Sequence, residues 1–355
     1  MFEFCPECGV PYYVTREHRW LNSGAIVLTR DPSQRVVFLE SANLDGLFDG
    51  ISRLIGTSID RIVIEAARKA TFSYMKAISP PEVQEKLAIG EMDPASLAEA
   101  SFLIAGIMGY GKPGIRDLRF QNRSDDYLEV SVDEPYCVPL LAGNFTGTME
   151  TFLGRHLGVN YDLHPPASCS LSIFEQEHAT ELHDRLHMRG YQERPGNITY
   201  ERCGTCGGPL ALSEYKWDLE RGTIKSRVTG RRMAILGPSM LDSVFHELEA
   251  ELGADVTRSV IEAQRLFTAT GFYRVEEMAT EDAVRCALAI RGLGEILSFE
   301  VSLEGMNVSM ASAVLAPMLA GLAQGMFEQA TGGASGAEWK LSSEGELTVA
   351  VKPQA

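Results

Sequence analysis

Hydrophobic residues recur at intervals of three and four in two long stretches of the chain. The first stretch is formed by Leu44, Leu47, Phe48, Ile51, Leu54, Ile55, Ile59, Ile62 and Val63. The second is formed by Leu241, Val244, Phe245, Leu248, Leu252, Val256 and Val260. This spacing places the apolar side chains on one face of a helix. Because a glycine interrupts each stretch, at Gly56 and at Gly253, we expect each to be two helices that meet at a break.

Two short β-rich runs precede each helical stretch. They span residues 25–29 and 36–39 in the first half, and residues 223–228 and 233–236 in the second. The turns between them carry Asp31-Pro32-Ser33 and Thr229-Gly230, so each pair predicts a β-hairpin. Further helical patterns follow at 81–87, 95–108 and 276–290, and strand patterns at 128–132, 171–174, 299–303 and 346–351. This order predicts an α+β fold, with helices packed on one face of a mainly antiparallel sheet.

The two halves of the sequence align with each other. The matched pairs include Cys5 with Cys203, Cys8 with Cys206, Gly24 with Gly222, Leu44 with Leu241, Phe48 with Phe245, Glu65 with Glu262 and Arg68 with Arg265. So many matches in register indicate a tandem duplication. We predict a first repeat at residues 1–190, a linker at 191–202 and a second repeat at 203–355, which together form a pseudo-dimer within one chain.

Composition narrows the class of protein. The chain has 355 residues, of which 45% are hydrophobic and 23% are charged, and its formal net charge is −16. Such a charge repels phosphate backbones, so nucleic acid is excluded as a partner. Neither a secretory signal nor an apolar run long enough for a membrane span is visible in the sequence. Seven cysteines, four of them in two Cys-x-x-Cys pairs, suit a reducing cytoplasm and metal binding better than disulfides.

The two Cys-x-x-Cys pairs predict a shared metal site. Neither repeat holds four paired cysteines, whereas Cys5 and Cys8 together with Cys203 and Cys206 complete the set that a structural Zn²⁺ requires. Such a closed site leaves no position for a substrate, so we expect it to be structural and not catalytic. The alternatives are four unliganded thiols, a redox Cys-x-x-Cys motif, and pairing of each knuckle with a second chain.

Other motifs give weaker signals for chemistry. The stretch from Gly106 to Pro113 approaches a phosphate-binding P-loop, but it follows a helical pattern and ends in Pro, so we interpret it as a helix end. Glu65 and Arg68 lie three residues apart, which favours a local ion pair over a pocket carboxylate. His183 and His187 share a helix face that we expect to be solvated. With no visible catalytic constellation, the sequence favours a protein that is not an enzyme without deciding the point.

The order of these parts resembles the 4-vinyl reductase domain family, whose relatives include TRAPP subunits and the sensing domains of aromatic-responsive regulators. The matching features are Arg35-Val36-Val37-Phe38, the run 128–132 followed by Cys137, and Gly143-Asn144-Phe145-Thr146-Gly147. The resemblance implies helices packed on an antiparallel sheet, with a hydrophobic small molecule held between them. Family regulators bind zinc through a late carboxylate and cysteines. Here only Cys137 and Cys169 occupy that region, and the N-terminal knuckles look like a separate, rubredoxin-type feature.

These observations favour a cytoplasmic, zinc-containing and non-enzymatic module that binds or senses a hydrophobic small molecule. Phe48, Phe102, Met108, Tyr110 and Phe120 are the candidate ligand contacts, all of them in the first repeat. In the second repeat we expect the Ala- and Met-rich run 306–326 to fill the equivalent space. The alternatives are an enzyme or accessory protein for a tetrapyrrole or another apolar substrate, and a protein-interaction scaffold. A sensor would need a protein partner that carries the output, and the chain would be able to pair further into a homodimer.

Overall fold

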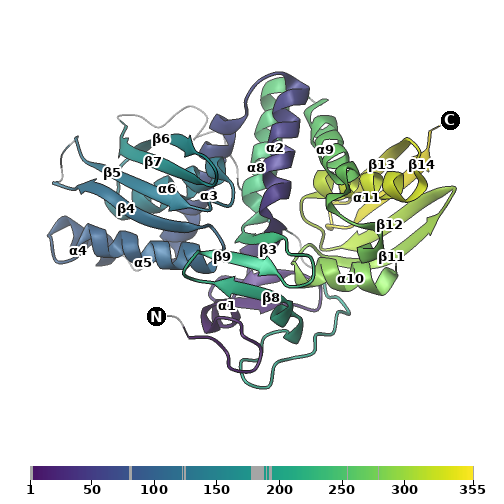
Figure 1. Cartoon of the computed structure of the whole chain (residues 1–355), viewed down its shortest axis with the longest axis horizontal. Coiled ribbons are helices and arrows are strands. Elements are labelled where there is room, and N and C mark those ends of the chain that lie inside the picture. The colour runs from purple at the N-terminus through teal and green to yellow at the C-terminus, as the bar shows by residue number, and fades with distance from the viewer. Residues whose placement is uncertain are drawn as a thin grey trace. The chain divides into compact units, whose positions relative to one another are not determined.

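The computed structural model describes residues 3–79, 82–121, 123, 125–176, 188, 190–191, 194–253, 255–278 and 280–354. The chain divides into two compact units, each described by itself below (Figure 1). Unit 1 comprises residues 1–59, 189–214 and 236–355. Unit 2 comprises residues 60–188 and 215–235. Among the described helices, none is long and apolar enough to cross a lipid bilayer.

Unit 1 begins with helix α1 (Tyr12–Glu17). Three antiparallel strands follow, β1 (His18–Trp20), β2 (Ile26–Leu28) and β3 (Arg35–Glu40), here called the hairpin extension, and they lead into helix α2 (Ser41–Ile55). The later part of the chain adds the helical elements η1 (Leu210–Glu214), α8 (Pro238–Leu252), α9 (Asp255–Phe267), η2 (Thr268–Phe272), η3 (Val275–Met278), α10 (Glu281–Ile290) and α11 (Ala316–Thr331). It also adds the strands β11 (Glu295–Ser302), β12 (Gly305–Ala311), β13 (Ser335–Leu341) and β14 (Leu347–Pro353).

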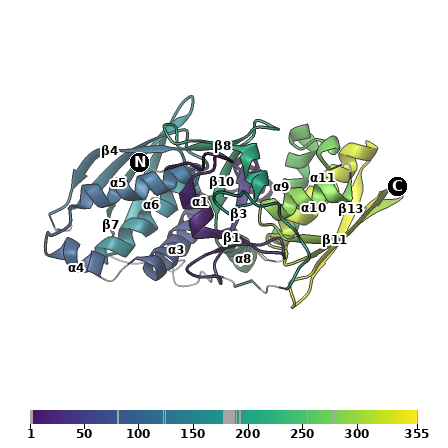
Figure 2. The same ribbon diagram turned by 90° about the horizontal axis from the view of Figure 1, so that it is seen from below.

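The four late strands of unit 1 form an antiparallel sheet in the order β11-β12-β14-β13. Helices α10 and α11 lie on the same side of this sheet (Figure 2). Residues alternate between the two faces, so that Met306, Val308 and Met310 on β12 are buried whereas Asn307 is exposed. The buried face of the sheet and the two helices enclose the core of this part of unit 1.

Unit 2 repeats this plan with other segments. Its elements are α3 (Asp60–Ile78), α4 (Glu82–Ala88), α5 (Pro94–Ile107), β4 (Lys112–Arg119), β5 (Tyr127–Asp133), α6 (Val138–Leu153), β6 (Leu157–His164), β7 (Ser168–Glu175), β8 (Tyr215–Asp218), β9 (Thr223–Ser226) and β10 (Arg232–Leu236). Its four-stranded antiparallel sheet has the order β4-β5-β7-β6, which is the order of the sheet in unit 1.

Glycines bring one pair of helices into close contact in each unit. On α6, a Cβ at Gly143 would collide with the carbonyl oxygen of Ile64 on α3. On α11, a Cβ at Gly321 would collide in the same way with the carbonyl oxygen of Ile261 on α9. The two helix pairs therefore pack backbone against backbone at corresponding positions, which glycine alone permits.

The predicted α+β class is confirmed, as are several local predictions. Strand β2 pairs with β3 and β9 pairs with β10 in antiparallel hairpins. The first long helical stretch breaks at Gly56, which has φ of 78° and ends α2 in the left-handed conformation. The second ends its first helix, α8, at Leu252, just before Gly253.

Each unit draws on both predicted repeats. The hairpin extension β1–β3 belongs to unit 1 together with residues 236–355, and strands β8–β10 belong to unit 2 together with residues 60–188. The units are therefore not the two predicted repeats taken whole. The repeat boundaries at 190 and 203 concern the sequence alignment, and they stay a prediction.

Candidate functional site: a cysteine cluster and an apolar cavity

The two Cys-x-x-Cys segments fold into matching knuckles in unit 1. In the first, Cys5 N donates to Val10 O and Gly9 N donates to Cys5 O, both at 2.9 Å. In the second, Cys203 N donates to Gly208 O at 2.9 Å and Gly207 N to Cys203 O at 3.0 Å. Gly9 and Gly207 both have φ of 72°, a value that favours glycine.

The knuckles bring their four sulfurs together into one group, here called the cysteine cluster (Cys5, Cys8, Cys203 and Cys206). All four Sγ atoms lie within 4.8 Å of one another. Cys5 Sγ is 3.6 Å from Cys203 Sγ, and Cys8 Sγ is 3.5 Å from Cys206 Sγ. Each knuckle therefore supplies two of the four thiols, as the sequence predicts for a shared site.

One carboxylate ties the two knuckles together beside the cysteine cluster. Glu7 accepts hydrogen bonds from Gly204 N at 3.1 Å, from Thr205 N at 3.0 Å and from Thr205 Oγ1 at 2.7 Å. The Thr205 hydroxyl, followed by the Gly204 amide, lowers the pKa of Glu7, so this carboxyl is ionised at neutral pH. The bonds fix the second knuckle against the first without using any sulfur.

The environment of the cysteine cluster acts unequally on its thiols. Burial raises the pKa of Cys5, but hydrogen bonds from the Cys8 and Glu7 backbone outweigh it and bring the pKa to about 7. Burial raises the pKa of Cys8 and of Cys203. Four crowded sulfurs cannot all ionise without a cation, because each thiolate repels the next. A metal that binds thiolates removes this conflict.

The geometry fits a tetrahedral Zn²⁺. With Zn–S bonds of about 2.3 Å, the edges of a tetrahedron of sulfurs are about 3.8 Å, and the Cys5–Cys203 and Cys8–Cys206 Sγ–Sγ distances lie just below this value. Three of the four cysteines are buried and Cys206 is half-buried. The four cysteines are close enough to bind a metal, and their donor chemistry is that of a closed structural zinc site.

A second feature of unit 1 is a hollow between the sheet and its helices, here called the apolar cavity. Its volume is about 310 Å³. It is lined by Val275, Val284, Leu288, Ile296, Phe299, Val301, Met306, Val308, Met310, Leu319, Leu322, Ala323, Met326, Ala330 and Val349. Among these described lining residues, none has a polar side chain. A cavity of this size stands at the lower end of the range for small-molecule sites.

The matching place in unit 2 is filled by aromatic side chains. Counting from the glycines that touch the neighbouring helix, Phe145 on α6 corresponds to Ala323 on α11, and Phe152 corresponds to Ala330. Phe145 and Phe152 are each 5% exposed, and the rings of Phe145 and Phe102 lie 5.2 Å apart. The expectation that the second half fills its space is therefore wrong, because two alanines stand where the first half has phenylalanines.

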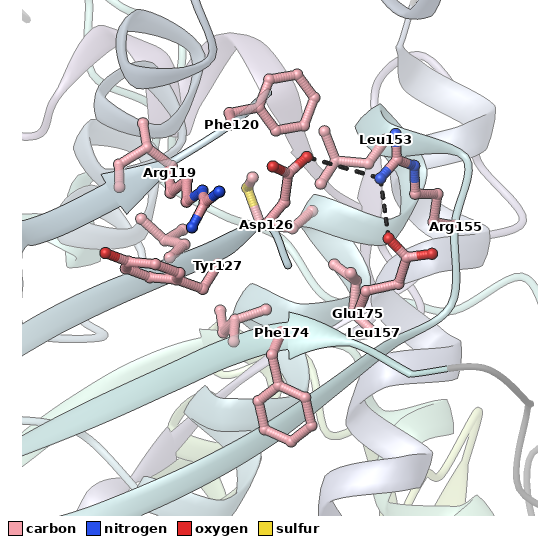
Figure 3. Close-up of a pocket in the computed structure, with 13 residues that line it drawn as sticks. Arg119, Phe120, Asp126, Tyr127, Leu153, Arg155, Leu157, Phe174 and Glu175 are labelled. Atoms are coloured by element: carbon pink, nitrogen blue, oxygen red, sulfur yellow. Dashed lines mark hydrogen bonds and ion pairs between the residues drawn. The ribbon is translucent and has the colours of Figure 1, made fainter. Parts of the chain in front are cut away.

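The pocket that contains Phe120 in unit 2 is much smaller, with a volume of about 20 Å³. Arg155 lies 3.6 Å from Asp126 and 2.9 Å from Glu175 beside it (Figure 3). A volume of this size holds about one water molecule. This pocket is therefore too small for an organic ligand.

The five predicted ligand contacts fall in different places. Phe48 is buried on α2 in unit 1, whereas the other four belong to unit 2. Phe102 packs on Phe145. Tyr110 stacks on Tyr136 with 4.4 Å between ring centroids and donates its hydroxyl to Ile235 O at 2.9 Å. Met108 follows the last residue of α5. Their role in ligand binding stays a prediction.

The remaining motifs have structural roles. Arg68 is 1% exposed and pairs with Glu65 at 2.5 Å, and Arg265 pairs with Glu262 at 2.5 Å, so the predicted local ion pairs are confirmed. The P-loop-like stretch ends α5 at Ile107 and enters β4 at Lys112, as predicted for a helix end. His183 and His187 lie outside the described residues.

Sequence reasoning missed the apolar cavity. The available signal was the replacement of Phe145 and Phe152 by Ala323 and Ala330, which an alignment through Gly143 and Gly321 makes visible. The matched pairs that indicate the duplication all lie before these two helices in each half of the chain.

Comparisons with known proteins identify no family for this chain. No protein-family model and no curated protein matches the chain. Among solved structures, the chain is similar to the phenol-responsive sensory domain of the transcription activator PoxR, crystallised with phenol. The match has 14% sequence identity, covers 46% of this chain and 87% of that chain, and has a TM-score of 0.36. A similarity at this level supports no argument about the function of this chain.

Proposed function

We propose that this chain binds a hydrophobic small molecule in the apolar cavity of unit 1 and holds a structural Zn²⁺ in its cysteine cluster. The observation that carries the proposal is a cavity of about 310 Å³ with a wholly apolar described lining. The cavity is partly open, since Val301 in its wall is 53% exposed, so an apolar ligand that covers the wall removes apolar surface from water.

The lining favours binding over catalysis. The described residues around the cavity are aliphatic side chains, methionines and one phenylalanine, and they supply no acid, base or nucleophile. Methionine side chains adapt their shape to a ligand, and Met306, Met310 and Met326 all contribute to the wall. The cysteine cluster adds no reactive position, because four thiolates complete the tetrahedron around the metal.

The zinc site has a structural task in this account. It joins cysteines that are 198 residues apart in the sequence, so metal binding closes a long loop of the chain. The matching knuckles, sheet orders and helix contacts support an origin by duplication. Pairing of two chains, and a partner that carries an output, remain predictions.

Titration with N-phenyl-1-naphthylamine, an uncharged apolar dye whose fluorescence rises in apolar surroundings, tests the proposal. We expect saturable binding of one dye molecule per chain, reversed by competing apolar compounds. Fluorescence that rises without saturation, or that does not rise at all, would show that the cavity is not a binding site.

A further inference from the structure

The C-terminal end of α10 is held by residues that flank the cysteine cluster. Four consecutive carbonyl groups at this end each accept a hydrogen bond from another part of unit 1. The pairs are Tyr200 Oη to Ala289 O at 3.2 Å, Trp20 Nε1 to Ile290 O at 2.9 Å, Phe38 N to Arg291 O at 2.9 Å and Arg35 Nη2 to Gly292 O at 3.0 Å. The bonds to Ile290, Arg291 and Gly292 pair carbonyls at a helix end, and the Tyr200 bond adds to the one that Ala289 O already accepts from Gly292 N.

Two of these donors are adjacent to the knuckles. Trp20 ends β1, the strand that follows the first knuckle and α1, and Tyr200 lies three residues before Cys203. Arg202, the neighbour of Cys203, donates to Trp20 O at 3.1 Å, and its Cζ lies 5.5 Å from the centroid of the Tyr200 ring. The cysteine cluster and the end of α10 are therefore joined by one set of side chains.

The same helix forms part of the cavity wall. Val284 and Leu288 on α10, and Val275 on the preceding η3, line the apolar cavity. Glu40 holds both ends of this wall segment: it accepts from Tyr273 Oη at 2.9 Å and forms an ion pair with Arg291. Glu40 is 3% exposed, so the pair is protected from solvent.

We infer that the cysteine cluster and the apolar cavity are energetically coupled through α10, so that metal binding raises the affinity of the cavity for its ligand. The inference rests on the proposed function of the cavity. Without metal the two knuckles are joined only by bonds such as those of Glu7, which weakens the support of Trp20 and Tyr200. The end of α10 then loses two hydrogen bonds, and the ligand must order the wall before it binds.

Thermodynamic linkage makes the coupling reciprocal. If the metal raises ligand affinity by some factor, the ligand raises metal affinity by the same factor. We expect a factor of roughly ten, within the common range for coupled sites. The effect of the metal on ligand affinity can therefore be checked by the effect of the ligand on metal affinity.

Unit 2 contains a matched control for the hydrogen bond between Trp20 and Ile290. Trp217 Nε1 donates to Ile107 O at 3.1 Å, just as Trp20 donates to Ile290 in unit 1. Unit 2 holds the pocket of about 20 Å³ at Phe120 and a polar pocket of about 210 Å³ whose lining includes Lys76, Gln84 and Glu150, and Trp217 lines neither of them. Gly237 is the sequence counterpart of Glu40, so the Glu40 ion pair has no equivalent at that position. Trp217→Phe therefore removes the same kind of bond without touching the wall of the apolar cavity.

The experiment compares the affinity of N-phenyl-1-naphthylamine for the zinc-loaded protein and for the protein after chelation. It also measures the affinity of the protein for zinc by equilibrium competition with EDTA, with and without the dye. We expect roughly tenfold weaker dye binding after chelation, and zinc affinity raised by the same factor when dye is present. Trp20→Phe and Tyr200→Phe should each reduce these effects, whereas Trp217→Phe should leave them unchanged.

The outcomes distinguish a failure of the coupling from a failure of the binding function. Equal dye affinity with and without zinc, or a zinc affinity that does not change with the dye, overturns the coupling and leaves the binding function standing. Dye that fails to bind the loaded protein overturns both. An equal effect of Trp20→Phe and Trp217→Phe would show that a general loss of stability, and not the α10 contact, explains the change.

Discussion

Ala323 stands on α11 where Phe145 stands on α6. Each residue lies two positions after the glycine, Gly321 or Gly143, at which its helix touches the backbone of a neighbouring helix. Phe145 is 5% exposed and packs on Phe102, whereas Ala323 lines a cavity of about 310 Å³. Together with Ala330 in place of Phe152, this change of side-chain size separates a filled core from an open one.

Replacing Ala323 with phenylalanine should close the apolar cavity. The new ring occupies the space that the ligand needs, so we expect the dissociation constant for N-phenyl-1-naphthylamine to rise by roughly tenfold or more, equivalent to about 1.4 kcal/mol or more. Fluorescence titration measures the effect. Ala350→Phe is the matched control, because Ala350 alternates with the buried Val349 and Val351 on β14 and so faces away from the cavity. Equal losses in the two variants would contradict the assignment of the site.

The reverse change in unit 2 should cost stability. Phe145→Ala removes a buried ring from its contact with Phe102, and such truncations cost about 3–5 kcal/mol of unfolding free energy. Urea denaturation measures the cost. A loss below about 1 kcal/mol would indicate that the core of unit 2 is less tightly packed than the structure shows.

Metal content tests the cysteine cluster. We expect one zinc per chain in the purified protein, and its loss in both Cys8→Ser and Cys206→Ser, because each removes one of four ligands and leaves an open tetrahedron. Elemental analysis against protein concentration gives the ratio. Cys286→Ser is the control, since Cys286 is exposed and lies outside the cluster. Two zincs per chain, or full zinc in either knuckle variant, would refute a single shared site.

Acidification should destabilise the protein through His18. His18 is 4% exposed and its Nδ1 lies 3.0 Å from Val14 O, and burial lowers its pKa below the usual value. As the pH falls through about 6.5, the unfolded chain gains a proton that the folded chain does not. The free energy of unfolding should therefore fall by up to about 1.4 kcal/mol per pH unit below that point.

Urea denaturation at saturating zinc, from about pH 7.5 to about pH 5.5, measures this slope around the histidine pKa. His18→Gln should be less sensitive to pH than the wild-type protein over this range. His164→Gln, at an exposed histidine, should behave like the wild type. If His18→Gln and the wild type lose stability in parallel, His18 titrates normally in the folded protein.

Helices and strands whose hydrophobic residues recur with a regular period were predictable from sequence, whereas elements without such a period were not. Helix α2 has one apolar face that starts after a hairpin and ends at a glycine, so its pattern identified it. Helix α6 is buried on almost every side, including at Gly143, Asn144 and Gly147, so its sequence shows no polar face and was recognised only as a family motif. Helix α11 was missed for the same reason.

The cysteine cluster was predictable from sequence. The apolar cavity was not, and neither was the unit to which each hairpin belongs. Four cysteines in two identical spacings leave few ways to complete a zinc site. By contrast, a sequence does not state to which unit a hairpin belongs. Here Trp20, from the start of the chain, donates a hydrogen bond to Ile290 near its end. A cavity depends on the fit of side chains from several elements, such as Val284 on α10 and Met306 on β12, which no single stretch reveals.

Native mass spectrometry with added N-phenyl-1-naphthylamine tests the central claim most directly, because it weighs metal and ligand on the same chain. The account predicts a wild-type species that carries one zinc and one dye molecule, and an Ala323→Phe species that carries the zinc but not the dye. A wild-type protein that keeps its zinc and never carries the dye, or an Ala323→Phe protein that binds dye as well as the wild type, would contradict it.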